Sequence, residues 1–102
     1  MLTLLVLTIA PELEEDLTDC LLELPEVNGF TTHQVSGHGE GGHMSIAEQV
    51  SGQRKRLQVE LIVPAHTVNH ILTHISETIG GDGVYWEQPV RNLGRFSDAK
   101  QE

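Results

Sequence analysis

Apolar residues fill almost every position at the start of the chain, from Met1 to Ile9. A strand that is apolar on both sides is typical of one that is covered on both faces of its sheet. Residues 53–63 instead alternate between apolar and polar side chains for most of their length, which predicts a strand with one buried face. Residues 30–36, which are rich in threonine and valine, and the short segment 84–87, which is ended by Pro89, predict two further strands.

Two other segments carry apolar residues at helical spacing and predict helices with one buried side. The first begins at Pro11, which suits a first helical turn, and ends at Pro25 and the turn 28–29. The acidic residues near its start suit the positive end of a helix. The second spans 65–79 and ends at the glycine-rich turn 80–83. The buried stripes are expected to be Leu13, Leu17, Cys20, Leu21 and Leu24 in the first helix, and Val68, Ile71, Leu72, Ile75 and Ile79 in the second.

The predicted elements follow one another in the order β-α-β-β-α-β. This order predicts an α+β fold of the ferredoxin-like type, a sandwich of one antiparallel sheet and two helices. Both crossovers share a hand, so both helices lie on one face of the sheet. The other face is then uncovered, although the first strand is apolar on both sides, and we therefore expect an oligomer. Residues 1–96 are expected to form the domain, and residues 97–102 a C-terminal tail.

Length and charge limit the kinds of partner. The 102 residues suffice for one domain with one core, and a formal net charge of -9 argues against a nucleic-acid-binding protein, which needs a basic face. The cations are clustered: one group is residues 54–56, and another includes Arg91, Arg95 and Lys100. If the fold brings these groups together, they form a local anion site. The alternative is that they are strand-end and tail charges that serve solubility.

The apolar first segment is not expected to be a signal peptide, because no basic residues precede it and Pro11 follows at once. It is also too short to span a membrane. We therefore expect a cytoplasmic protein with no direct membrane insertion. Cys20 is the single cysteine and cannot form an internal disulfide. Its place on the apolar stripe predicts a buried thiol with no catalytic role.

A glycine-rich segment lies between the second and third predicted strands, where four glycines fall within residues 37–42. Glycine lets the backbone take positive φ and lets a ligand approach closely. Long loops inside small domains are usually either functional or disordered. We therefore expect residues 37–52 to form a flexible loop, of which residues 37–48 become ordered when a ligand or a partner binds.

Three segments, in register, resemble the PII-like signalling proteins. Residues 35–39, V-S-G-H-G, are similar to the V-K-G-F-G run that opens the PII T-loop. Residues 57–63 resemble the strand that leaves that loop, and residues 80–83, G-G-D-G, resemble the I-G-D-G turn of the PII B-loop. The resemblance covers roughly residues 1–96. Among the PII-like proteins, the chain resembles in particular an uncharacterised family that is often encoded beside heavy-metal efflux systems. The related CutA proteins have the same fold.

The resemblance implies a trimer with sheets facing the threefold axis, helices outside, and ligand sites in the clefts between subunits. In PII these sites take adenine nucleotides, whose phosphates would be held by glycine N–H groups and by arginines. This chain has Val84 where the PII turn continues with a lysine, and Arg95 where the tail normally supplies two arginines. A smaller or less charged effector, or none, is the alternative to a nucleotide. By position, the matching residues are Gly37, Gly39, Arg56, Gly81, Asp82, Gly83 and Arg95.

The six histidines fall into two sets, each of which can be read as a metal site or as a set of exposed polar residues. In the loop set, His38 and His43 lie on flexible backbone and could converge on one zinc, nickel or copper ion. In the helix set, His70 and His74 are four residues apart, a spacing that suits one shared ion but also suits a solvated helix face. The remaining two are His33, near the loop set, and His66, on the second helix.

The sequence shows no Ser-His-Asp or Cys-His nucleophile pattern, and we expect no enzyme. Our leading hypothesis is a PII-like trimeric regulator that binds a small effector and uses residues 37–48 to contact a partner protein, with a membrane transporter as a candidate partner. The alternative is a transition-metal-binding or metal-tolerance protein of the CutA kind that uses its histidines. A third hypothesis is a structural trimer whose loop bridges a partner without any small ligand.

Overall fold

In the part of the chain that the computed structural model describes, residues 1–38 and 54–99, four strands and two α-helices follow in the predicted order. A short 3-10 turn leads into each helix, and another lies near the C-terminus. The strands are β1 (Leu2–Ile9), β2 (Thr31–Gly37), β3 (Arg54–Pro64) and β4 (Val84–Val90), the helices are α1 (Glu14–Leu22) and α3 (Val68–Ile79), and the 3-10 turns are η1 (Pro11–Leu13), η2 (Ala65–Thr67) and η3 (Phe96–Asp98).

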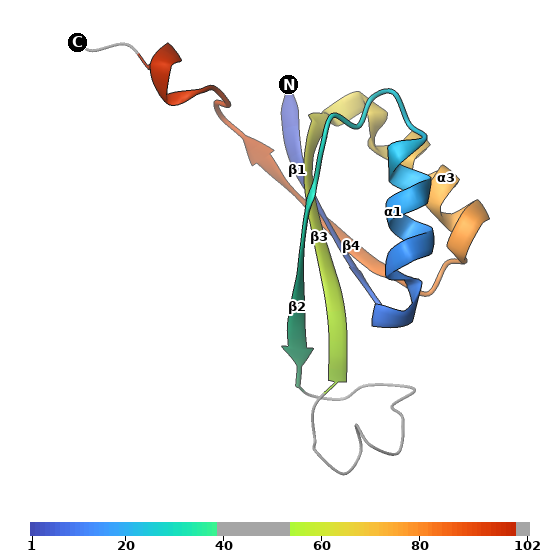
Figure 1. Ribbon diagram of the computed structural model, residues 1–102. Coiled ribbons are helices and arrows are strands. Elements are labelled where there is room, and N and C mark those ends of the chain that lie inside the picture. Colours follow the sequence, from blue (N-terminus) through green and yellow to red (C-terminus); the bar gives the residue numbers. More distant parts are fainter. Residues whose placement is uncertain (39–53, 100–102) are drawn as a thin grey trace.

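The strands form an antiparallel sheet in the order β2-β3-β1-β4 (Figure 1). Strand β1 pairs along its whole length with β3, from Leu2 opposite Pro64 to Ile9 opposite Leu57. Its other side pairs with β4, so β2 and β4 are the edge strands. The predicted α+β fold, with a four-stranded antiparallel sheet and two helices on one face, is confirmed. The trimeric part of that prediction concerns other copies of the chain and stays a prediction.

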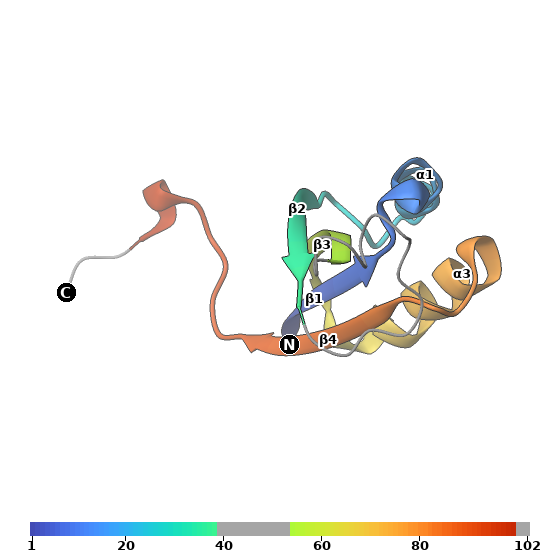
Figure 2. The same cartoon turned by 90° about the horizontal axis from the view of Figure 1, so that it is seen from below.

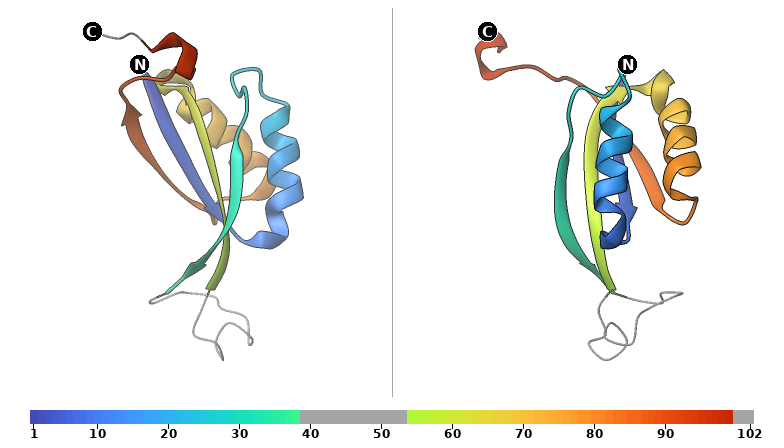
Figure 3. Two further views of the ribbon diagram at one scale, coloured as in Figure 1. Left: turned by 60° about the vertical axis from the view of Figure 1, so that its left-hand side comes forward. Right: turned by 45° about the vertical axis from the view of Figure 1, so that its right-hand side comes forward.

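The core lies between one face of the sheet and the two helices, which cover that face side by side (Figures 2 and 3). Full burial of each large apolar side chain contributes about 1.5–3 kcal/mol relative to exposure. Both predicted helical stripes point into this core, with Leu13, Leu72 and Ile79 partly buried at its margin. The buried side chains are Leu5, Leu7 and Ile9 from β1, Leu57, Val59, Leu61 and Val63 from β3, Leu17, Cys20 and Leu21 from α1, Leu24 after it, and Val68, Ile71 and Ile75 from α3.

Strand β4 differs from the prediction, which ended it at Glu87 because Pro89 follows. The strand continues to Val90, and Pro89 lies inside it, opposite Thr3 of β1. Proline lacks an N–H donor and is tolerated in a sheet mainly on edge strands. Because β4 is an edge strand, the missing donor leaves the neighbouring pairing intact. Thr3 reinforces this end of the pair, since its hydroxyl donates to the carbonyl of Gln88 at 3.2 Å.

The face of the sheet that the helices leave uncovered carries a mixture of apolar and polar side chains. At its centre Val6 is only 2% exposed, between its paired neighbours Glu60 and Trp86. Burial of Val6 therefore needs no second copy, contrary to the simplest reading of the two-sided apolar strand. The exposed apolar surface of this face lies on β4, where Val84 is 61% and Trp86 is 41% exposed.

Residues 91–99 leave the end of β4 and extend away from the sheet and the helices (Figure 1). We call this segment the C-terminal arm. It carries the 3-10 turn η3 and two exposed large apolar side chains, Leu93 and Phe96. Among the described helices, none is long and apolar enough to cross a membrane.

Candidate functional site

A two-stranded ribbon projects from one end of the sheet. Strand β1 ends at Ile9, opposite Leu57, but β2 and β3 continue as a pair until Gly37 lies opposite Arg54. The tip of this ribbon is where the predicted flexible loop begins (Figure 1). Gly39 and His43, two of the predicted site residues, lie outside the described residues. A Cβ on Gly37 would meet only ordinary contacts, at 3.6 Å from the carbonyl oxygen of Arg54, so packing does not require glycine there.

The turn 80–83 lies at the same end of the sheet as the ribbon. Gly80 ends α3 with φ +92, a value that L side chains rarely adopt, and its N–H donates to the carbonyl of Ser76 at 3.0 Å. Asp82 is exposed in the middle of the turn. Gly83 packs directly on β1, because a Cβ there would lie 3.1 Å from Cγ2 of Ile9 and 3.2 Å from the carbonyl oxygen of Thr8. The turn is therefore held against the end of β1.

Arg56 lies where the ribbon joins the sheet, opposite Val35. Its guanidinium Nη1 donates to the carbonyl of Lys55 at 2.8 Å, and a guanidinium has five such N–H donors. It lines a mixed polar and apolar hollow of about 380 Å³ together with Lys55, Gln34 and Ser36. Arg56 and the turn 80–83 thus lie at the same end of the sheet in one chain. The predicted ligand site lies between subunits and stays a prediction.

Arg95 lies elsewhere in the chain. It directly precedes η3 in the C-terminal arm, which follows the end of β4 that is remote from the turn 80–83 (Figure 1). Its N–H donates to Oδ2 of Asp98 at 3.1 Å, and its carbonyl accepts from the N–H of Asp98 at 2.9 Å. A single chain therefore does not bring Arg95 to Arg56. The prediction placed the two on different subunits, and that part stays a prediction.

The helix histidines contact acidic residues that the sequence analysis did not assign to them. Nε2 of His70 lies 3.4 Å from Oε1 of Glu26, and Nε2 of His74 lies 3.9 Å from Oε2 of Glu23. These pairs link α3 to the end of α1, and they are ion pairs only when the imidazole is protonated. The side chain of His70 is 67% exposed and that of His74 is 30% exposed, so His74 is the less solvated of the two. One feature of the sequence could have indicated these contacts, because acidic residues lie at the end of the first helix.

Metal-binding geometry is absent from the described part of the chain, where no three His, Cys, Asp or Glu side chains form a group that could hold an ion. His38 follows β2 at the tip of the ribbon and is exposed. Its predicted partner in the loop, His43, falls among the residues not described, so the loop site stays a prediction.

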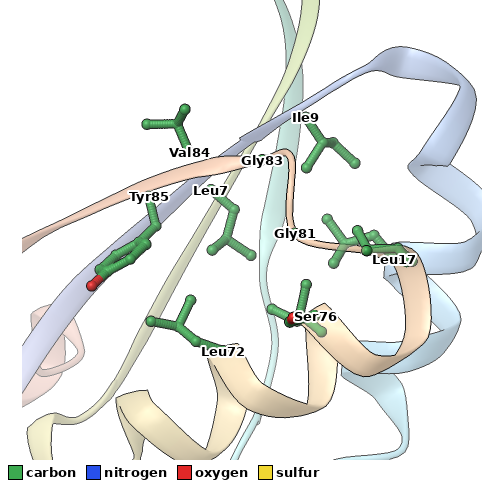
Figure 4. Close-up of a pocket in the computed structure, with 12 residues that line it drawn as sticks. Leu7, Ile9, Leu17, Leu72, Ser76, Gly81, Gly83, Val84 and Tyr85 are labelled. Atoms are coloured by element: carbon green, nitrogen blue, oxygen red, sulfur yellow. The ribbon is translucent and has the colours of Figure 1, made fainter.

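A cavity of about 210 Å³ lies between α3, the turn 80–83 and the start of β4. Figure 4 shows Leu72 of α3 and Tyr85 of β4 on its sides, with Leu7 and Ile9 of β1 behind them. Its walls are mostly carbon, with hydroxyls only from Ser76 and Tyr85. The sequence assigned Leu72 and Ile79 to the core stripe, but periodicity does not reveal whether the space beside a stripe is filled. The cavity was therefore missed.

Burial perturbs one titratable group on the core side of α1. The Cys20 thiol is buried, which raises its pKa from the ordinary value of 9.0, while a hydrogen bond with the Thr78 side chain acts in the opposite direction. The group stays a neutral thiol near neutral pH, and thiolate chemistry at this position is disfavoured. This agrees with the prediction that Cys20 has a packing role.

Comparison with known proteins gives one family and one fold. Residues 1–97 match the model of the family described as "Protein of unknown function (DUF3240)". The crystal structure of a DUF3240 family protein from Shewanella baltica OS155 superposes with a TM-score of 0.77 at 24% identity. The match covers 93% of this chain and 96% of that one, and at this identity it shows a shared fold. No curated protein matches the chain.

Proposed function

We propose a function for this chain from the premise that it belongs to the DUF3240 family. In our proposal it is a homotrimeric regulatory protein of the PII-like kind. A small anionic effector, for which an adenine nucleotide is the first candidate, binds between subunits beside the turn 80–83. The effector changes the order of the loop carried by β2 and β3, and the ordered loop contacts a partner protein such as a membrane transporter.

The observation that carries the proposal is the position of the ribbon relative to the turn. The ribbon formed by residues 35–37 and 54–56 extends beyond the end of β1, and the turn 80–83 packs on that same end through Gly83. An effector bound at this end would touch both the fixed turn and the base of the loop. Contact with both would let the effector bias the order–disorder equilibrium that we predict for the loop.

The charges at this end suit an anion that is bound by few groups. Arg56 offers a guanidinium that can pair with phosphate or carboxylate oxygens, and the backbone N–H groups of the turn can add neutral donors. Asp82 brings a negative charge into the same turn, and Val84 replaces the lysine of the PII pattern. Lys55 lies beside Arg56 in the same hollow, and a highly charged polyphosphate would need further cations. Arg95 can contribute its charge only from another copy, since in its own chain it follows the end of β4 that is remote from the turn.

The uncovered sheet face supports the proposed assembly. Both edge strands are exposed, and Trp86 and Val84 leave apolar surface on the face that the helices do not cover. Apolar patches of this kind often mark protein interfaces. In a closed cyclic assembly every subunit makes the same contacts, so a neighbour would cover this face in each subunit.

The test combines light scattering with calorimetry on the full chain. We expect a trimer at micromolar concentration, and titration with ATP, ADP or inorganic phosphate should give saturable heat. Arg56→Ala should weaken binding by about 1.5–3 kcal/mol, because a hydrogen bond to a charged group is lost. Asn69→Ala removes an exposed polar side chain of α3 outside the proposed site and should bind as the parent does. A monomer, or equal anion affinity in the parent and Arg56→Ala, would contradict the proposal.

A second candidate function is transition-metal binding by the loop histidines. It is favoured by the exposure of His38 at the tip of the ribbon, where a loop ligand could join it. Neutral imidazole is a good ligand for zinc, nickel and copper ions, so the same calorimetric series should include these metals. Heat with a metal but none with anions would favour this candidate over the effector-binding one.

A further inference from the structure

The cavity between α3, the turn 80–83 and the start of β4 is complete within one chain, and the function proposed above does not use it. It lies on the helix side of the sheet, where Tyr85 pairs with Leu7 of β1 and both side chains line it. The next residue, Trp86, pairs with Val6 and belongs to the uncovered face. An assembly formed through the uncovered face would therefore leave this cavity accessible.

The size and the walls of the cavity suit one small aromatic ring system. An engineered apolar cavity of about 150 Å³ in another protein binds benzene. The cavity here, about 210 Å³, is about 1.4 times as large, which suits about eight or nine non-hydrogen atoms. Leu7, Ile9 and Leu72 provide hydrocarbon walls, and the ring of Tyr85 forms one side (Figure 4). Because aromatic rings pack favourably on one another, an aromatic ligand suits this space better than an aliphatic one of the same volume.

The electrostatics of the cavity favour a neutral ligand that carries a hydrogen-bond donor. The last turn of α3, a helix that the structure describes in full, carries no basic residue to offset the negative end of its dipole. The turn that follows adds the exposed carboxylate of Asp82. The Ser76 hydroxyl, which lines the cavity, can accept from an N–H or O–H of the ligand. An anionic ligand would be repelled at this end of α3.

The same walls distinguish the cavity from a nucleotide site. A purine base carries several ring nitrogens, and each one that meets hydrocarbon without a partner costs free energy. The side-chain hydroxyls of the lining come from Ser76 and Tyr85, and the other side chains of the lining are apolar. Arg56 lines the separate hollow at the ribbon and not this cavity. The chemistry of the cavity is therefore opposite to that of the proposed anion site.

We propose that this cavity binds a small neutral aromatic molecule of about the size of indole, whose N–H or O–H group donates to the Ser76 hydroxyl. The ligand lies between α3 and β4 of one chain, with the turn 80–83 beside it. This inference goes beyond the proposed regulatory function and depends neither on the trimer nor on an anionic effector.

The test is a nuclear magnetic resonance titration of the isotope-labelled full chain, with indole as the probe. We expect indole to shift the methyl signals of Leu72 and Ile79 and the amide signals of Gly81 and Gly83, because an aromatic ring changes the magnetic field around it. Benzofuran has the shape of indole without the N–H, and should bind about 2- to 12-fold more weakly because a neutral hydrogen bond is lost. Benzoate, an anion of similar size, should leave these signals unchanged.

Two variants and a matched control locate the site. Gly81→Leu should abolish indole binding, because its Cβ would lie 3.9 Å from Oγ of Ser76 and the longer side chain would occupy the cavity. In this turn the positive φ belongs to Gly80, so a side chain at Gly81 is not strained. Gly29→Leu is the matched control, since a Cβ there would meet nothing within 4 Å and Gly29 does not line the cavity. Ser76→Ala should remove the preference for indole over benzofuran.

Several results would overturn the proposal. These are indole shifts confined to other parts of the chain, equal indole affinity in the parent and Gly81→Leu, and benzoate shifts that match those of indole. A preference for indole that persists in Ser76→Ala would also overturn it, and this variant decides the matter if Gly81→Leu does not fold. The proposed regulatory function is tested separately, by anion titration of the parent and Arg56→Ala, so the failure of one proposal is distinguishable from the failure of the other.

Discussion

The packing of Gly83 against β1 gives a prediction whose size follows from the structure. A Cβ at this position would lie 3.1 Å from Cγ2 of Ile9 and 3.2 Å from the carbonyl oxygen of Thr8. Ordinary van der Waals contacts begin near 3.4 Å. The methyl of Ile9 can move, but the oxygen of Thr8 belongs to the backbone of a strand that is paired on both sides. The turn must therefore shift away from the sheet in Gly83→Ala.

The expected net cost is about 1 kcal/mol of unfolding free energy. Overpacking typically costs about 1–3 kcal/mol. Replacing glycine by alanine offsets about 0.4–1 kcal/mol of this by restricting the unfolded chain. Two glycines serve as controls. Gly81→Ala would meet only Oγ of Ser76, at 3.9 Å, and Gly29→Ala would meet nothing within 4 Å, so neither should lower stability by this mechanism.

The assay is equilibrium unfolding in urea, followed by the fluorescence of Trp86 at one fixed protein concentration, because association makes apparent stability depend on concentration. The midpoint should fall for Gly83→Ala at an unchanged slope, which identifies a loss of stability rather than a change in the surface exposed on unfolding. If Gly83→Ala were as stable as Gly81→Ala, the turn would not be held against β1 in the way described. In that case the turn could not act as the fixed side of an effector site.

Two further predictions concern groups that titrate. Burial raises the pKa of Cys20, so the stabilisation that the neutral thiol provides should be fully present below pH 9.0 and lost as the pH rises through the folded-state pKa. Urea unfolding at alkaline pH should therefore show a fall in stability with rising pH in the parent, and Cys20→Ala should lack this contribution. If the loop binds a metal, zinc affinity should fall as the pH is lowered, because only neutral imidazole coordinates. Calorimetry should then find the heat lost in a His38→Ala/His43→Ala variant and kept in His70→Ala/His74→Ala, and the reverse result would move the site to α3.

The order of elements could be predicted because β3 and the two helices have periods that show in the sequence, and the other strands stand out by residue type. Strand β3 alternates in burial from Leu57 to Val63, and every apolar residue of the α3 stripe faces the core or its margin. Pro89 misled the prediction of β4, since local rules treat proline as a strand breaker and cannot tell that a strand will be at an edge. Edge position is a property of the whole sheet, and it becomes visible only when strand pairing is known.

The candidate site could be predicted only in part, for a related reason. Arg56 and the turn 80–83 come to one end of the sheet, because the antiparallel order fixes which strand ends lie together. The cavity beside Leu72 and the contact of His74 with Glu23 were missed. Both depend on how far α3 lies from its neighbours, a distance that no pattern along a single segment encodes. The sequence therefore indicates which segments lie near one another, whereas the shape of the space between them depends on the packed structure.

Val6 shows that apolar residues on both sides of a strand do not by themselves require a second copy of the chain. Apolar residues on both sides of β1 predicted that something must cover the second face. Within one chain Val6 is already covered, because it lies between paired Glu60 and Trp86 on the two neighbouring strands. The exposed apolar surface that favours association therefore lies on β4, at Trp86 and Val84, and on Phe96 in the arm. These side chains lie at the edge and beyond the end of the sheet, so neighbours that covered them would do so along β4 and its arm as well as face to face.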